Sequence, residues 1–200
     1  MRTHKKIIIA HHLILSGYGH WLPNDPRGSG SDTIRNDDLM DLGPIHHGRK
    51  AIQPPKSELK KFYRRAEPRL DQQTIWFDDA MRAGIADAIM AVVEAFTYTL
   101  WACAICRNHI HLVVRKHRDN GDVIWRNFAE GTRQQLLGNF GIAVDHPVWS
   151  DRPYTVFLYS PEDVRTRIRY VEQNPIKEGL GAQRFGFVKA YDGWPHIKGH

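Results

Sequence analysis

The stretch TLWACAIC (residues 99–106), RN (107–108) and HIHLVVRK (109–116) combines two apolar segments with a short polar break between them. Both segments have the aromatic and β-branched side chains that favour strands, and the break predicts the turn of a β-hairpin. Alternate side chains of a strand point to one face of a sheet, so His109 and His111 are expected to lie side by side. Two imidazoles placed in this way can bind one divalent metal ion.

The predicted elements around this hairpin alternate between strands and helices. Asp78 or Asp79 is expected to cap the helix before the hairpin, where apolar side chains recur at a helical period. The order β-α-β-β-α-β predicts an α+β fold of the ferredoxin-like type, an antiparallel sheet with helices on one face plus a C-terminal helix. Its first and third strands are central, which places the histidine pair in the middle of the sheet. Besides the hairpin, the predicted elements are a strand at 5–16, helices at 56–70, 79–98 and 123–140, and a strand at 155–159.

The C-terminal helix has a strong start signal in Ser160-Pro-Glu-Asp163, where serine caps the helix and proline occupies its first turn. We expect Asn174-Pro175 to end or kink this helix, because proline cannot donate the backbone hydrogen bond. Residues four apart on a helix are neighbours, so Tyr170 and Asn174 share one face. A phenol, an amide oxygen and a metal-binding histidine pair together suggest nucleophilic attack on a phosphodiester.

These motifs resemble those of the single-tyrosine HUH transposases of bacterial insertion sequences, and most closely the REP-associated tyrosine transposases. The resemblance extends over most of the chain. It rests on YGHWLP (18–23), NHIH (108–111), Trp149 before a strand, and the segment 169–179. The chain departs from the family pattern at Cys106-Arg107, where these proteins usually have Met-Pro. An HxH triplet alone has little specificity, so the joint spacing of the motifs carries the resemblance.

The resemblance implies a metal-dependent DNA endonuclease and strand transferase that takes part in transposition and DNA recombination. A divalent metal, Mg²⁺ or Mn²⁺, would be bound by His109, His111 and Asn174. Tyr170 would attack single-stranded DNA at a site next to a hairpin, leaving a 5′-phosphotyrosine and a free 3′-hydroxyl. Lys177 is the candidate for activating the phenol or holding the leaving oxygen, because a free phenol is a weak nucleophile at neutral pH.

The charge of the chain also suits a nucleic-acid partner. Lys and Arg number 28 against 22 Asp and Glu, which gives a formal net charge of +6, and such a field attracts polyanions. Solvated lysines alone could produce the same charge. Aromatic side chains in the Gly/Pro-rich region can stack on unpaired bases, and the basic segment 56–69 can contact the phosphates of a hairpin stem, although a solvated helix face explains that segment equally well. The candidate DNA-binding residues are Tyr18, Trp21, Arg27, Lys60, Lys61, Arg64 and Arg65.

Length and composition bound the organisation of the chain. The 200 residues are expected to form a single HUH transposase domain, with an inserted loop or small subdomain at about 17–75, where Gly, Pro, Asp and Asn are frequent. No apolar run approaches the ~20 residues of a membrane-spanning helix, and the N-terminus does not resemble a signal peptide. We therefore expect a soluble bacterial protein of the cytoplasm, associated with the nucleoid and without a membrane partner.

Cys103 and Cys106 are the only cysteines, and they precede the histidine pair in the pattern Cys-x-x-Cys-x-x-His-x-His. That pattern could be a structural zinc site. However, residues three apart on a strand point to opposite faces of the sheet, which disfavours a site with both thiols. Buried free thiols are the expected state, because the short spacing and a reducing cytoplasm also disfavour a disulfide.

Three functions remain open from the sequence. Besides a transposase, the chain could be a non-cleaving, domesticated nucleic-acid-binding protein that keeps only the fold. It could also be a metal-dependent phosphodiesterase in which a metal-bound water attacks and Tyr170 only positions the substrate. Either histidine of the pair, taken alone, is more readily explained as a core group. His11 and His12 in the first strand are expected to be structural, since only one of them can face the pair. The sequence leaves open whether the protein forms a homodimer.

Overall fold

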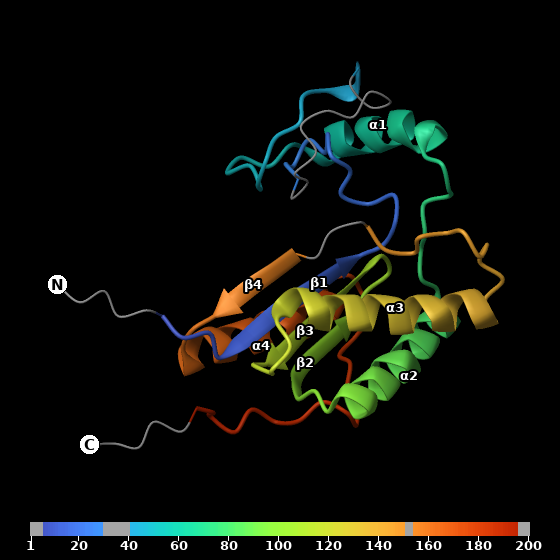
Figure 1. Cartoon of the computed structure of the whole chain (residues 1–200). Helices are drawn as coiled ribbons and strands as arrows, with labels where there is room; N and C mark the ends of the chain where they lie inside the picture. The colour runs from blue at the N-terminus through green and yellow to red at the C-terminus, as the bar shows by residue number, and fades with distance from the viewer. Residues whose placement is uncertain (1–5, 30–40, 151–153, 196–200) are drawn as a thin grey trace. The chain divides into compact units, whose positions relative to one another are not determined.

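A computed structural model describes residues 6–29, 41–150 and 154–195, and every structural statement below refers to these ranges. Four strands form one antiparallel sheet in the order β2-β3-β1-β4 (Figure 1). Strands β1 and β3 are central, so the predicted ferredoxin-like α+β fold is confirmed. The strands are β1 (Ala10–Ser16), β2 (Leu100–Ile105), β3 (His109–Arg115) and β4 (Tyr154–Leu158), and the helices are α1 (Lys56–Ala66), the short 3₁₀ helix η2 (Glu67–Arg69), α2 (Asp79–Phe96), α3 (Gly121–Asn139) and α4 (Pro161–Lys177).

Both faces of the sheet are covered, each by different helices. Helices α2 and α3 lie against one face and α4 lies against the other (Figure 1). Side chains of β3 alternate between the two faces: Ile110 is fully buried on the side of α2 and α3, whereas His111 contacts Tyr170 of α4. An apolar cluster on the α4 side buries Val164 and Val171 of that helix. The fold therefore presents the histidine pair to the C-terminal helix.

The N-terminus of α4 has the cap that the sequence predicts. The Ser160 hydroxyl accepts a hydrogen bond from the backbone N–H of Asp163 at 3.1 Å. In return, the Asp163 carboxylate accepts one from the backbone N–H of Ser160 at 3.0 Å. This reciprocal pair satisfies two backbone donors that the helix itself cannot satisfy, and it fixes where α4 begins.

Among the predicted boundaries that differ from the structure, two have a clear physical reason. The prediction that α4 ends or kinks at Asn174-Pro175 is wrong about the end, because the helix includes Pro175 and continues to Lys177. Proline this close to the last turn costs only one backbone hydrogen bond, and Pro175 is buried. The strand predicted at 5–16 begins only at Ala10, because its partner β4 ends opposite that residue, at Leu158. Residue 5 lies outside the described ranges.

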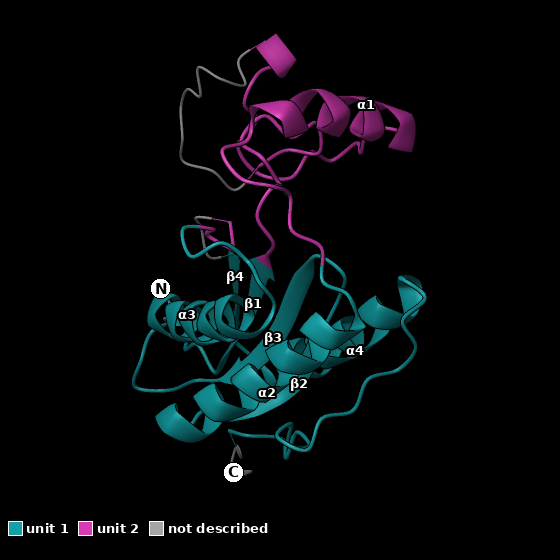
Figure 2. Cartoon of the chain, turned by 90° about the vertical axis from the view of Figure 1, so that its right-hand side faces the viewer, with its two compact units in different colours: residues 1–15, 77–145, 153–200 teal, residues 16–76, 146–152 magenta. Residues whose placement is uncertain are grey.

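The chain divides into two compact units (Figure 2). One unit contains residues 1–15, 77–145 and 153–200, and so includes the histidine pair and helices α2, α3 and α4. The other contains residues 16–76 and 146–152, with α1. One small apolar cluster of this second unit consists of the buried Leu22, Phe62 and Ala66. Within the described ranges, no helix combines the length and apolar character needed to span a membrane.

Candidate metal and nucleophile site

His109 and His111 lie on the same face of β3, as the strand alternation predicts. Their ring centroids are 4.8 Å apart and their planes are nearly perpendicular, at 89°. His111 is buried, whereas His109, at the start of the strand, is partly exposed. A hydrogen bond of 2.7 Å between His109 Nδ1 and the Asn108 side-chain oxygen orients the first ring. The pair is therefore open to solvent at the end of the strand where His109 lies.

His12 of β1 is the histidine of the first strand that faces the pair, in line with the expectation that only one of His11 and His12 can do so. Its Nε2 lies 2.9 Å from His111 Nδ1, and the two rings stack with centroids 5.1 Å apart. His12 is fully buried, and its Nδ1 has no hydrogen-bond partner among the described residues. His11 points to the opposite face of the sheet, where it lies beside Gly121 at the start of α3.

Burial keeps the three imidazoles of the site neutral. Burial, with a smaller contribution from the positive charge of Arg167, lowers the pKa of His12 to about 3. Burial also holds the pKa of His111 well below its usual value, with smaller contributions from the neighbouring histidines and Arg167. The pKa of His109 is lowered by burial as well, although the Glu178 carboxylate acts in the opposite direction. A neutral imidazole has a lone pair with which it can bind a metal ion.

Tyr170 approaches the histidines from α4. Its ring meets that of His111 edge to face, with centroids 5.7 Å apart, and its centroid is 6.0 Å from that of His12. The side chain is nevertheless 39% exposed, so a substrate can reach it. The apolar positions Val164 and Val171 hold the helix against the sheet and thereby place the tyrosine over the histidines.

Two cations from the same helix flank Tyr170. The Arg167 guanidinium carbon lies 5.3 Å from the centroid of the tyrosine ring, and the Lys177 ammonium nitrogen lies 5.7 Å from it. Asn174 is one turn from Tyr170, but its amide nitrogen donates to the Tyr170 carbonyl at 2.7 Å. The structure thus brings Tyr170 next to His111 and Lys177 next to the Tyr170 ring, whereas the Asn174 amide is bonded to its own helix. No pattern in the sequence had pointed to Arg167 as a site residue.

Glu178 and Cys106 also belong to this region. Glu178 follows α4 directly, and its Oε1 lies 3.9 Å from His109 Nδ1. Burial and the hydrogen-bonded Glu178 carboxylate raise the pKa of the Cys106 thiol to about 12. One potential ligand atom from each of Cys106, His109 and Glu178 lies within 4.8 Å of the other two. Glu178 was not predicted from the sequence, although its position eight residues after Tyr170, about two helical turns, was the available signal.

The predicted DNA-binding residues Trp21 and Arg27 lie together in the second unit. The Arg27 guanidinium stacks on the indole of Trp21, with its central carbon 3.7 Å from the ring centroid. The same guanidinium forms an ion pair of 2.6 Å with the buried Asp25 and donates to the Tyr63 hydroxyl at 2.8 Å. Arg27 is therefore committed to internal contacts, and the exposed surface here is that of Trp21. Tyr18, the other predicted aromatic contact, is half-buried.

The basic residues of α1 form one exposed face. At 3.6 residues per turn they span an arc of about 140° on the helix, and the buried Phe62 and Ala66 lie on the remaining side. Arg65 also forms an ion pair of 3.6 Å with Asp41. The residues of this basic face are Lys60, Lys61, Arg64 and Arg65.

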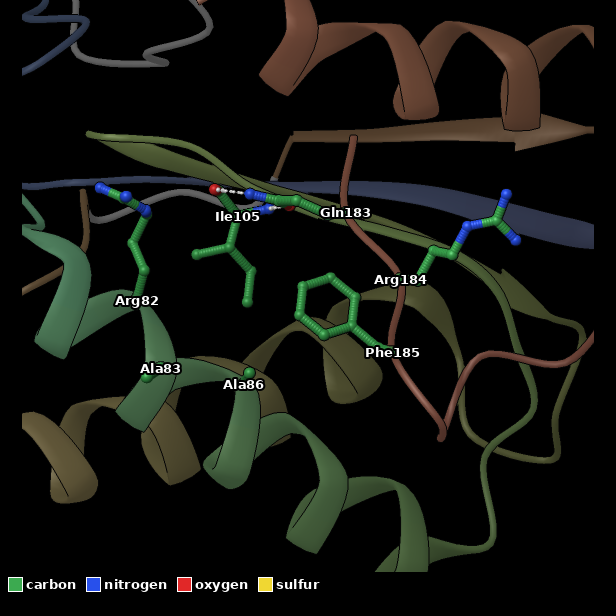
Figure 3. A pocket seen from close by; sticks show the side chains of 7 residues that line it. All are labelled: Arg82, Ala83, Ala86, Ile105, Gln183, Arg184 and Phe185. Atoms are coloured by element: carbon green, nitrogen blue, oxygen red, sulfur yellow. Dashed lines mark hydrogen bonds between the residues drawn. The ribbon is translucent and has the colours of Figure 1, made fainter. Parts of the chain in front are cut away.

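A pocket of about 250 Å³ lies between α2 and the segment 183–185 (Figure 3). Much of its lining is apolar and includes Ala86 and Phe185. The Gln183 amide closes one side by forming two hydrogen bonds of 2.8 Å with the backbone of Ile105. The lining contains neither the histidines nor Tyr170, so this pocket is separate from the candidate site.

The donor set fits the Mg²⁺ or Mn²⁺ that the family resemblance implies. Neutral imidazole nitrogens can bind a divalent ion, and the side chains of Asn174 and Glu178 offer the oxygen ligands that Mg²⁺ and Mn²⁺ prefer. His12 adds a second argument, because it buries a ring nitrogen that has no hydrogen-bond partner in the part of the chain that the structure describes. Such a group reduces stability, and stability costs of this kind are typical of functional sites.

No protein-family model matches the chain, and no curated protein matches it. Among solved structures, the chain is similar to a REP-associated tyrosine transposase bound to a REP hairpin. That similarity has a TM-score of 0.47 and 12% identity, and it covers 90% of this chain and 76% of the other. The chain is also similar to a candidate transposase from Deinococcus radiodurans R1, with a TM-score of 0.39 and 12% identity over 92% of this chain and 100% of the other.

Proposed function

We propose that the protein is a metal-dependent nuclease and strand transferase of the HUH transposase type, acting on single-stranded DNA next to hairpins. The observation that carries the proposal is the position of Tyr170, an accessible phenol held edge-on against His111. A tyrosine that only packs in the core would be buried. A tyrosine that is only a surface residue would not face neutral imidazoles. The family resemblance of the motifs supports the same function. Within this proposal, residues 1–200 act as one HUH domain and 17–75 are its insertion.

His109 and His111 are the proposed metal ligands, with Asn174 as the third. For this role the Asn174 oxygen would face the ion while its amide nitrogen keeps the bond to the Tyr170 carbonyl. A divalent ion bound there withdraws negative charge from a phosphate oxygen, which makes the phosphorus easier to attack. The neutral state of both rings, which burial enforces, leaves their lone pairs free for the ion.

Tyr170 is the proposed nucleophile. Its phenol loses the hydroxyl proton to water, and the oxygen forms a bond to phosphorus as the bond from phosphorus to the 3′-oxygen breaks. The 3′-oxygen leaves with the bonding electrons and takes up a proton. The products are a 5′-phosphotyrosine and a free 3′-hydroxyl. The phosphoester is exchanged rather than hydrolysed, so the strand can be rejoined without a nucleotide cofactor.

Lys177 and Arg167 supply the positive charge that this step requires. Both lie within 6 Å of the Tyr170 ring centroid. Positive charge favours the phenolate over the phenol, and it stabilises negative charge that develops on the departing oxygen. We assign the leaving oxygen to Lys177, because its flexible stem lets the ammonium group follow that oxygen.

The second unit is proposed to bind the hairpin. The basic face of α1 offers four cations to the phosphates of a stem, and contacts of this kind supply affinity without sequence information. Trp21 is proposed to stack on an unpaired base, a contact worth ~1 to 3 kcal/mol. Arg27 would act on DNA only indirectly, by holding the indole in place.

The first prediction tests the nucleophile. Wild-type protein with Mn²⁺ and hairpin-containing single-stranded oligonucleotides from the flanking genome should form a covalent adduct, visible as a shifted band on a denaturing gel. Tyr170→Phe removes one hydroxyl, so it should abolish the adduct while the fold and DNA affinity persist. Tyr159→Phe is the matched control, because Tyr159 is exposed to the same extent, 39%, and lies just before α4. The control should behave as wild type.

The other outcomes point to the alternative functions. An adduct that persists in Tyr170→Phe would show that another residue attacks. Cleavage by the wild type without any adduct would indicate attack by water and hence a phosphodiesterase. Binding without cleavage at saturating Mn²⁺ would indicate a nucleic-acid-binding protein that has lost its chemistry.

A further inference from the structure

The Cys106 thiol, a group that can bind soft metal ions, lies beside His109 at the closed end of the hairpin. The backbone N–H of Cys106 donates to the His109 carbonyl at 2.8 Å, so the two residues face each other across the strands. Paired residues of an antiparallel sheet have their side chains on the same face. Cys103 is three positions earlier and pairs with Leu112, so its thiol lies on the opposite face. The structure therefore separates the two cysteines and joins only one of them to a histidine.

The end of α4 brings a carboxylate to the same place. The Arg107 guanidinium donates to the Glu178 carbonyl at 2.6 Å, and the Arg107 backbone N–H donates to the Glu178 carboxylate at 3.4 Å. The Cys106 thiol also hydrogen-bonds to that carboxylate. One ligand atom from each of Cys106, His109 and Glu178 lies within 4.8 Å of the other two. Three ligands of different chemistry thus converge on one point.

The combination of sulfur, nitrogen and oxygen ligands selects the class of ion. Thiolates bind Zn²⁺ and similar soft or borderline ions, whereas Mg²⁺ prefers oxygen. Bonds of about 2.0–2.3 Å around tetrahedral zinc place its ligand atoms roughly 3.3–3.6 Å apart. The observed separations of up to 4.8 Å are therefore about 1 Å too wide. A change of side-chain torsion at Glu178, which is partly exposed, can supply most of that closure.

We propose that Cys106, His109 and Glu178 form a binding site for Zn²⁺ or a chemically similar ion. The site has three protein ligands and leaves a fourth position open, and it includes a thiol where the family pattern has methionine. It shares His109 with the catalytic pair but requires neither Tyr170 nor His111. The site therefore does not depend on the proposed nuclease function.

Cobalt substitution in the tag-free, full-length protein tests this site directly. Co²⁺ bound to a thiolate gives an intense charge-transfer band in the near ultraviolet, which imidazole and carboxylate ligands alone do not give. The wild type should develop this band with about one equivalent of Co²⁺ and lose it when Zn²⁺ is added. Cys106→Ser should abolish the band, and the matched control Cys103→Ser should retain it. Circular dichroism melting would verify that both variants are folded.

Two results would overturn the site: a wild type without the band, or a band that persists in folded Cys106→Ser. If Cys106→Ser does not fold, Glu178→Gln gives an equivalent test, because Glu178 is partly exposed and lies outside the helix. That variant should bind Co²⁺ at least tenfold more weakly while keeping the band at saturation. Unchanged affinity in Glu178→Gln would remove the carboxylate from the site and contradict the proposal.

Discussion

His111 has one ring nitrogen available for a metal ion, because its Nδ1 faces His12 Nε2 at 2.9 Å. When Nδ1 carries the proton and donates it to His12, the Nε2 of His111 has the lone pair that a metal needs. In the opposite tautomer Nε2 is protonated and cannot bind. His12 is therefore a positioning residue, which acts on the metal through the tautomer and orientation of His111.

The corresponding prediction concerns Mn²⁺ affinity measured by calorimetry in the absence of DNA. His12→Phe removes the acceptor and should weaken Mn²⁺ binding by ~10- to 100-fold. His12→Gln keeps a carbonyl oxygen as acceptor and should restore most of the affinity. His11→Phe is the control, since His11 lies on the other face of the sheet. Equal affinity in His12→Phe and wild type would refute the positioning role, whereas a wild type that does not bind Mn²⁺ would count against the proposed function itself.

The relative positions of two site residues could be predicted where they depend only on the number of residues between them. The i, i+2 spacing of His109 and His111 and the i, i+4 spacing of Tyr170 and Asn174 follow from local structure. The contact between His12 and His111 depends instead on the pairing of β1 with β3, which joins residues 99 positions apart. Nothing in the local sequence distinguishes His12 from His11, because both stand in the same apolar strand.

Among the elements, α4 matters most, because it carries the proposed nucleophile. Its capping box joins Ser160 and Asp163 and satisfies backbone donors at its first turn. Ser160→Ala should lower the free energy of unfolding by about 1 kcal/mol, measured by urea denaturation. Gln173→Ala, at an exposed position in the same helix, should change it by less than about 0.5 kcal/mol. Equal midpoints for wild type and Ser160→Ala would show that the cap contributes nothing to stability.

The ends of the helices and strands could be predicted from the sequence only in part. Ser160 and Asp78 are both confirmed as caps, because capping side chains act on backbone groups a few residues away. Pro175 was misjudged because its position in the last turn, and its burial, reduce the cost of the missing hydrogen bond. The start of β1 was misjudged because it is set by where β4 ends, which is a property of another segment.

For the whole molecule, the net charge of +6 leads to a prediction about salt. Each lost phosphate contact should reduce the slope of log affinity against log salt concentration by ~0.7 to 0.9. Lys60→Glu combined with Arg64→Glu should therefore flatten the salt dependence of hairpin binding, measured by fluorescence anisotropy. A matched double reversal at the exposed Arg118 and Arg126 in the other unit should weaken binding less and leave the slope nearer to wild type. If the two double variants show the same salt dependence of hairpin binding, the basic face of α1 is only solvated.

The overall fold was predictable because the order of strands and helices admits few topologies. The internal arrangement of the second unit was not. Tyr63 bonds to both Asp25 and Arg27, which lie more than 35 residues earlier in the chain. The sequence of this unit has little periodic pattern. The contacts between its side chains form only once the chain has folded, so residue spacing does not predict them.

The bond from Arg107 to the Glu178 carbonyl has a consequence for how sequences of this kind can vary. It fastens the end of α4 to the hairpin turn, while Ser160 and Asp163 define its beginning. A helix held at its end by this bond, and packed on the sheet through Val164 and Val171, cannot rotate freely about its axis. One residue inserted between Tyr170 and Glu178 would turn the phenol by about 100° and carry it away from the histidines. The number of residues between these two positions is therefore constrained by the geometry of the site, in addition to the side chains of Asn174 and Lys177 that the proposed function uses.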